Sequence, residues 1–170
     1  MSSRPFINVL VLCTGNSARS ILAEALFNHL GAGRVRAYSA GSHPAGIVNP
    51  MALETLARHS IQAPADVRSK SWDEFAALGA PHFDYIFTVC ASAAGEACPV
   101  WPGHPATIHW SIADPAHIEP EEARREAFER AFRSLEKRIR AFLALDLSVL
   151  SCKDVVMAAR MIHEAASEVE

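Results

Sequence analysis

The chain has 170 residues, half of them hydrophobic, and a formal net charge of −3. This length and composition fit one domain with a proper core, while the charge suggests neither a nucleic acid nor an acidic membrane surface as partner. No apolar run is long enough to span a membrane. We therefore expect a cytoplasmic protein whose four cysteines are free or catalytic rather than paired in structural disulfides.

The first half of the chain alternates short apolar runs with segments of helical spacing. The run at 6–12 is rich in β-branched residues, which favours a buried strand. Residues 21–30 have apolar side chains at helical spacing, and a glycine follows them. Residues 34–41 alternate like a strand. An Asn-Pro pair then predicts the capped start of a helix over 49–57.

The second half continues the same alternation. We expect a short helix at 71–75, strands at 84–90 and 107–110, and amphipathic helices at 121–145 and 151–169. Strands that alternate with helices predict an α/β fold, here three α/β/α layers around a central four-stranded parallel sheet. Ligands of such sheets bind at the carboxyl ends of the strands.

One stretch where the first strand meets the first helix carries most of the chemistry: Cys13-Thr14-Gly15-Asn16-Ser17-Ala18-Arg19-Ser20. A loop at this position points backbone N–H groups inward, and the helix N-terminus adds positive charge. Gly15 and Asn16 tolerate left-handed dihedral angles, and Arg19 can hold two oxygens of a tetrahedral anion. The same field should lower the pKa of Cys13 and make it a nucleophile, with Ser20 donating to its sulfur. The alternative is that Cys13 is a small core residue and Arg19 a surface charge.

A second candidate residue is Asp114, which precedes Pro115 in a loop after the fourth predicted strand. Displacing hydroxide from a tetrahedral centre needs a general acid near the departing oxygen, and an aspartate on such a loop can serve. Asp-Pro is also a common turn dipeptide, so the pair alone does not establish this role.

The order of these features resembles the low-molecular-weight tyrosine phosphatase family: Cys-x5-Arg-Ser first, then Asp-Pro before the last long helix. The resemblance runs from about residue 8 to about residue 145 and implies the phosphotyrosine protein phosphatase I-like fold. It also implies that Cys13 is the nucleophile and Asp114 the acid, and that residues 14–20 bind the oxyanion. Two strings look still more like the arsenate reductases built on that fold, CTGNSARS and His109-Trp110-Ser111-Ile112-Ala113-Asp114-Pro115.

Two further cysteines distinguish a reductase from a phosphatase. Cys90 ends the third predicted strand, and Cys98 follows after seven small or flexible residues. The resemblance implies that such a pair carries a disulfide outward from Cys13 in thioredoxin-coupled reductases; relatives that use glutathione and glutaredoxin carry a similar VC…CPVWPG string. The alternatives are core packing of both cysteines, or a zinc site with His104 and His109. The zinc spacing fits no standard site, so we expect no metal.

The predicted reaction is the thiol-dependent reduction of arsenate to arsenite, which would serve arsenic detoxification. The Cys13 thiolate attacks arsenic, Asp114 protonates the departing hydroxide, and a second thiol, Cys90 or glutathione, attacks the sulfur of the adduct. Phosphate or sulfate should bind as mimics of arsenate. The alternative is a phosphatase that hydrolyses phosphomonoesters through a phosphocysteine; Ile21 argues against it, because the phosphatases usually carry proline at that position.

No bound cofactor is expected, only an external thiol reductant. That reductant is either glutathione with glutaredoxin or thioredoxin. Pro99, Trp101 and Pro102 tether Cys98 to a partly apolar stretch, and moving it would uncover apolar surface at a cost of about 25 cal/mol per Å². We therefore favour the glutathione and glutaredoxin route, which asks less motion of this segment.

Two smaller predictions complete the sequence analysis. Some family members support the loop with residues like Asn16, Glu24 and Ser39, and with an aspartate that helps to hold a potassium ion. Here Lys70 can pair with Glu24 instead, so we expect no potassium requirement.

We divide the chain into a catalytic domain at 1–147 and a helical extension at 148–170. The apolar stripe of that extension, which includes Cys152, packs on its own domain or forms a dimer contact, in a monomer or a homodimer.

Overall fold

The computed structural model describes residues 6–90 and 105–170, and its centre is a parallel sheet of four strands in the order β2-β1-β3-β4. The third strand of the chain returns beside the first, so the carboxyl ends of β1 and β3 are neighbours. The predicted strands are confirmed with slightly different ends: β1 Ile7–Leu12, β2 Val35–Ala40, β3 Tyr85–Thr88 and β4 Ala106–His109.

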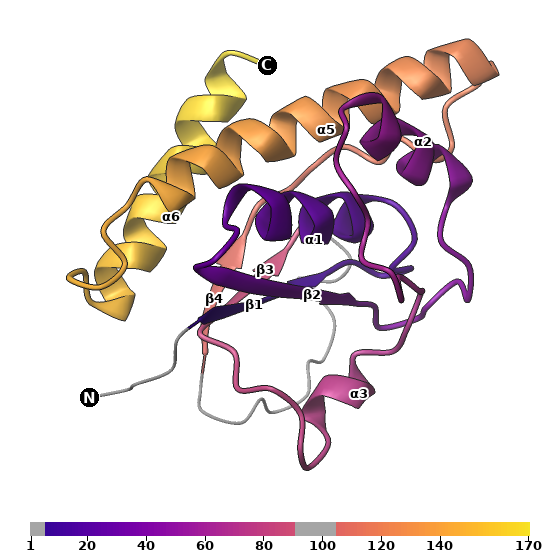
Figure 1. Ribbon diagram of the computed structural model, residues 1–170. Helices are drawn as coiled ribbons and strands as arrows, with labels where there is room; N and C mark the ends of the chain where they lie inside the picture. The colour runs from indigo at the N-terminus through magenta and orange to yellow at the C-terminus, as the bar shows by residue number, and fades with distance from the viewer. Residues whose placement is uncertain (1–5, 91–104) are drawn as a thin grey trace.

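The helices cover the two faces of the sheet unequally, as Figure 1 shows: α1, α5 and α6 lie on one side and α3 on the other. The three-layer α/β/α architecture is thereby confirmed. Among the described residues the layer around α3 is much the smaller. The helices are α1 Arg19–Leu30, α2 Pro50–Arg58, α3 Asp73–Ala76, α5 Glu121–Leu143 and α6 Cys152–Glu168.

Strand β1 is buried on both faces, which explains its continuous apolar sequence. Val9 and Val11 join the large core beneath α1 and α5, while Leu10 and Leu12 join a smaller core with Trp72 and other aromatic residues around α3. Because β1 is packed on both faces, the loop that follows it at Cys13 begins at a fixed position.

The last helix packs on the domain. Val155 and Ala159 of α6 are fully buried in the large core. Cys152 is exposed, so its place in the predicted apolar stripe was wrong: it is the first residue of the helix, ahead of the first core position. The division at 147 and 148 remains a prediction. No helix in the described ranges is both long and apolar enough to cross a membrane.

Candidate active site

The loop after β1 is held from its outer side by main-chain hydrogen bonds. Carbonyl oxygens of the loop accept N–H groups of the segment 43–49, which curls around it. Because the C=O and the following N–H of a trans peptide point in opposite directions, the intervening N–H groups of the loop face its concave side, as an oxyanion cradle requires. The bonds are His43 N to Thr14 O, Ala45 N to Gly15 O and Asn49 N to Ser17 O, at 2.9, 2.9 and 3.0 Å.

Asn16 makes the sharp turn of the loop, with φ of +45°. Its side chain is fully buried; Oδ1 accepts the backbone N–H of Lys70 at 2.9 Å, and Nδ2 donates to Ser20 Oγ at 2.9 Å. The left-handed conformation expected at Asn16 is confirmed. Gly15 does not adopt it, because Asn16 makes the turn alone. For Ser20 the structure records a bond to Asn16 and, among the described residues, none to Cys13.

Gly41, at the end of β2, lets the loop lie close against the neighbouring strand. A Cβ atom at this position would lie 2.4 Å from the carbonyl oxygen of Thr14 and 2.7 Å from that of Cys13. Both contacts are with backbone, which cannot move aside without displacing the loop. Sequence analysis placed Gly41 only at the end of a strand; its packing against the loop carries no sequence signal.

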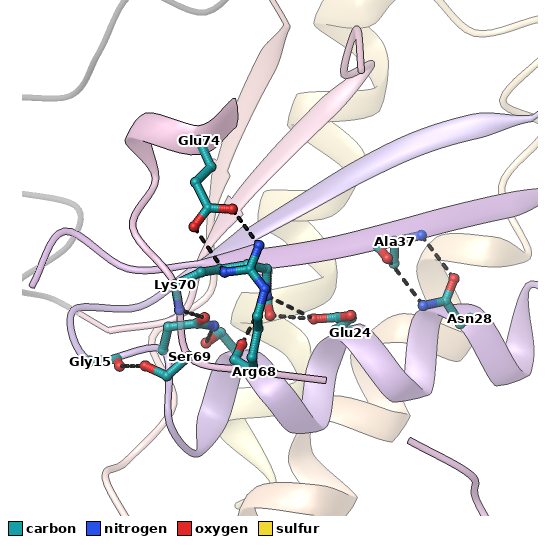
Figure 2. Close-up of polar contacts among 11 residues, drawn as sticks. Gly15, Glu24, Asn28, Ala37, Arg68, Ser69, Lys70 and Glu74 are labelled. Carbon is teal, nitrogen blue, oxygen red and sulfur yellow. Dashed lines mark hydrogen bonds and ion pairs between the residues drawn. The ribbon is translucent and has the colours of Figure 1, made fainter. Parts of the chain in front are cut away.

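A buried polar layer lies beneath the loop (Figure 2). Ser69 donates its hydroxyl to the carbonyl of Gly15 at 3.0 Å, and Lys70 Nζ lies 4.0 Å from Glu24 Oε1. Ser39 also donates to Glu24. Burial raises the pKa of Glu24 and lowers that of Lys70, while each residue's charge acts against the other's shift. The predicted pairing of Lys70 with Glu24 is confirmed.

Cys13 and Cys90 come together at the carboxyl ends of β1 and β3. Both are buried, and the thiol of Cys90 is hydrogen-bonded to that of Cys13. Cys90 Sγ also accepts the backbone N–H of Thr14 at 3.2 Å. The Cys90 thiol and burial raise the pKa of Cys13 above that of an ordinary thiol, against the lowering effect of Arg19. The lowered pKa expected from sequence was wrong for this state, because the neighbouring thiol and the burial outweigh the guanidinium.

Arg19 links the cradle to the second loop. Its Nη1 donates to the carbonyl of Ile112 at 2.9 Å, and its Nη2 lies 3.7 Å from Asp114 Oδ2. Asp114 is therefore placed beside the arginine that would hold the oxyanion, as an acid for that anion must be. Its side chain is 40% exposed, and its Oδ1 accepts the backbone N–H of Ala116.

The structure thus brings Cys13, Arg19, Cys90 and Asp114 into one site at the carboxyl ends of β1 and β3. Cys98 and His104 lie outside the described residues. No group of three or more potential metal ligands occurs in the ranges 6–90 and 105–170. Two residues that shape the loop, Gly41 and Ser69, were not predicted as part of the site.

Comparisons with known proteins identify the family of the chain. Residues 8–153 match the family described as low molecular weight phosphotyrosine protein phosphatase. An arsenate reductase of Shouchella clausii (strain KSM-K16) is 33% identical over 135 residues, which span 79% of this chain and 93% of that protein.

Two solved structures are also similar. An arsenate reductase from Archaeoglobus fulgidus DSM 4304 aligns with a TM-score of 0.58 and 32% identity, over 78% of this chain and 98% of that chain. A thioredoxin-dependent arsenate reductase of Corynebacterium glutamicum aligns with a TM-score of 0.55 and 26% identity, over 82% of this chain and 64% of that chain. The chain belongs to the low molecular weight phosphotyrosine protein phosphatase family, and its relatives there include arsenate reductases.

Proposed function

We propose that this protein is an arsenate reductase that uses Cys13 as nucleophile and an external thiol as electron source. The observation that carries the proposal is the contact between two buried thiols, Cys13 and Cys90, at the floor of an oxyanion cradle. Hydrolysis of a phosphomonoester needs one thiol and water. Reduction needs two electrons, and a second thiol against the first can supply them.

The first step is the attack of the Cys13 thiolate on arsenic, with Asp114 giving a proton to the hydroxide that leaves as water. Arg19 and the inward N–H groups of residues 14–20 hold the remaining oxygens. Binding and attack require the Cys13 proton to leave, and the raised pKa makes this deprotonation a necessary part of the reaction. The product is an arseno-cysteine adduct that still contains As(V).

The second step transfers the electrons. The sulfur of Cys90, having lost its proton, attacks the sulfur of Cys13; an S–S bond forms, the S–As bond breaks, and its electron pair leaves with arsenic. Arsenite is released, and an external thiol must then reduce the disulfide. Atoms and electrons balance, since two thiols become one disulfide while As(V) becomes As(III).

A single-turnover experiment tests this scheme. Protein reduced beforehand and freed of reductant should convert one equivalent of arsenate, and mass spectrometry of the digested product should show the Cys13–Cys90 disulfide. Cys13→Ser should abolish turnover. Substantial arsenate reduction by that variant would refute the scheme. Exposed Cys152 gives a matched control, since Cys152→Ser should leave the single turnover intact.

The external reductant is the second question. The residues that follow Cys98 in the sequence favour glutathione with glutaredoxin, while the related thioredoxin-dependent enzyme of Corynebacterium glutamicum favours thioredoxin. A reductant swap on one preparation decides between them. With Cys98→Ser, loss of turnover in glutathione while Cys13 remains reactive would show that Cys98 belongs to the relay and that our preference for glutathione is wrong.

Phosphatase activity is the second candidate function, favoured by the family match itself. Phosphate and arsenate share shape and charge, so we expect slow hydrolysis of aryl phosphates through a Cys13 phosphothiol. The two functions separate at Cys90: its change to Ala should spare hydrolysis and stop disulfide formation. Phosphatase turnover that exceeds thiol-dependent arsenate reduction would reverse our assignment.

The cellular location, the domain division and the oligomeric state are part of the same proposal. We propose a cytoplasmic enzyme, because its chemistry needs reduced thiols, and a catalytic domain at 1–147 followed by the extension at 148–170. Light scattering on the reduced protein distinguishes the monomer from the homodimer.

A further inference from the structure

Trp110, the residue before the Asp114 loop, is held by the last helix. Its ring is 1% exposed and packs against Phe87 and Phe142. The indole Nε1–H donates to the carbonyl of Ala159 in α6 at 3.0 Å. Because a buried indole N–H without a partner is costly, this bond fixes both the ring and the helix that supplies the acceptor.

The far end of α6 has a second anchor on α5. Arg138 is 1% exposed and therefore must be paired. Its guanidinium meets three residues from the last turns of α6 and just beyond: His163 Nδ1 at 2.9 Å, Ser167 Oγ at 3.1 Å and the Glu170 carboxylate at 2.8 and 2.9 Å. The helix that holds Trp110 is thus fixed at its middle and at its end.

The acid loop has few hydrogen bonds to the other described elements, although Ile112 and Pro115 are buried. A cavity of about 450 Å³ separates residues 111–115 from α5, lined on the helix side by Ala127 and Ala131. The backbone bonds that join the loop to the sheet are Trp110 N to Thr88 O at 2.8 Å and Ile112 N to Val89 O at 3.0 Å. Beyond Ile112 the loop is held by the approach of Arg19 to Asp114, by the burial of Pro115 and by the packing of Ala116 against the large core. Its starting point at Trp110 therefore helps to set where Asp114 lies.

The family match ends at residue 153, only two residues into α6. We propose that α6 is a positioning element for the acid of this enzyme, and that Trp110 is the positioning residue through which it acts. The helix fixes the indole, the indole fixes the start of the loop, and the loop presents Asp114 beside Arg19. This inference rests on the proposed role of Asp114.

The test is a double-mutant cycle on the full chain, with Trp110→Phe and Asp114→Asn singly and together. Trp110→Phe keeps an aromatic ring at this position, removes the donor to Ala159 and leaves a smaller side chain in the core. We expect kcat for arsenate to fall about three- to tenfold, the effect of one lost hydrogen bond, while KM is unchanged. In the Asp114→Asn background the same change should have no further effect on kcat, because the acid that it positions is absent.

An equal fall in both backgrounds would mean that Trp110 acts only through general stability, and would overturn the inference. Unchanged kcat in Trp110→Phe alone would overturn it too. If Asp114→Asn alone kept the full rate, the acid assignment itself would fail, and this inference with it. Rates are normalised to the concentration of reactive Cys13, so that loss of folded protein does not imitate a loss of positioning.

A milder variant guards against misfolding of Trp110→Phe. Glu170→Gln weakens the second anchor on Arg138 and should lower kcat in the same direction by a smaller factor, while hydrogen exchange in α6 speeds up. The matched control is Glu136→Gln, which removes the half-buried carboxylate partner of the exposed Arg140 on α5. That control should change neither kcat nor hydrogen exchange in α6. An unchanged kcat in Glu170→Gln despite faster hydrogen exchange would contradict the positioning role of α6.

Discussion

The two loops of the site are held in different ways. The cradle at 13–20 is fixed by main-chain bonds from segment 43–49 and by a buried polar layer that includes Asn16 and Lys70. The loop that presents Asp114 is fixed at its start by Trp110 and at its tip by Arg19. The binding half of the site is therefore held mainly by main-chain bonds along its length, whereas the acid half depends on the side chains of Trp110 and Arg19.

Exposure separates the two loops as well. Asn16 and Ser20 are fully buried, while the side chain of Asp114 is 40% exposed. A rigid cradle suits a site that must hold a charged anion, since prearranged N–H groups need no reorganisation when charge develops. An acid that donates and recovers a proton needs contact with solvent. Substitutions should therefore separate binding from proton transfer.

The largest expected effect within this comparison comes from removing the acid. Asp114→Asn takes away the proton donor and leaves the cradle and its main-chain bonds in place. Since general acid catalysis contributes about 10²–10⁴-fold, we expect kcat for arsenate to fall within that range. Phosphate affinity, measured by calorimetry, should stay close to that of the unmodified protein. A loss of phosphate binding as large as the loss of rate would show that the two loops are not separable.

The second prediction disturbs the cradle and spares the acid. Gly41→Ala forces a Cβ against the carbonyls of Thr14 and Cys13 and displaces inward N–H groups. Losing one oxyanion donor costs about 10²–10³-fold in rate, so we expect a fall toward the lower end of that range together with weaker phosphate binding.

The matched control for Gly41→Ala is Gly31→Ala, where a Cβ would lie 2.8 Å from the carbonyl of Phe27 and from the side chain of Val35, between α1 and β2. Both changes overpack the protein, at about 1–3 kcal/mol each, and should lower the thermal midpoint. Only Gly41→Ala should weaken phosphate binding. Equal phosphate affinity in the two variants would mean that Gly41 does not shape the cradle.

The cradle was easier to predict from sequence than the acid loop, because its residues are consecutive in the chain. Residues 13–20 form one uninterrupted stretch between an apolar strand and a helix, so local rules predicted the place of the loop and the left-handed turn at Asn16. Asp114 could be proposed, but not its contact with Arg19, because that contact depends on how β3, β4 and α1 are arranged.

One contact of the acid loop had no sequence signal, and one electrostatic property of the cradle was predicted wrongly. Trp110 donates to a backbone carbonyl of α6, and every residue has such a carbonyl, so no residue type marks the partner. The pKa of Cys13 was expected to fall from the positive charge near it, and the expectation was wrong because burial and the Cys90 thiol act more strongly. The burial of Cys13 and its contact with the Cys90 thiol both depend on three-dimensional packing, which composition and spacing do not give.

The third prediction concerns the pKa of Cys13 in the cradle, which a titration measures. In the unmodified protein, the raised pKa means that Cys13 is protonated at neutral pH and that its thiolate fraction rises as pH increases. Cys90→Ala removes the largest raising contribution and leaves the opposing charge of Arg19 in place. The pKa of Cys13 should fall by about one unit, the equivalent of one hydrogen bond.

Thiolate absorbance in the ultraviolet gives the Cys13 titration as the difference between a protein and the same protein carrying Cys13→Ser, and this difference is measured both with Cys90 and with Cys90→Ala. The subtraction removes the signals of Cys98 and Cys152, which are present in both proteins. The Cys13 titration should move to lower pH when Cys90 is absent. Movement to higher pH, or none, would show that the two thiols do not interact.

The smallest expected effect concerns the cation beneath the cradle. The ammonium of Lys70 lies 4.0 Å from the buried carboxylate of Glu24, where its charge partly offsets the cost of burying that carboxylate. We therefore expect the same turnover in potassium and sodium salts at equal ionic strength. Lys70→Ala removes the internal cation and leaves Glu24 beside the loop, so this variant should gain activity and thermal stability when potassium replaces sodium. Lys153, at the exposed start of α6, gives the control, because Lys153→Ala should respond to neither salt. A several-fold stimulation of the unmodified protein by potassium would mean that Lys70 does not replace the ion.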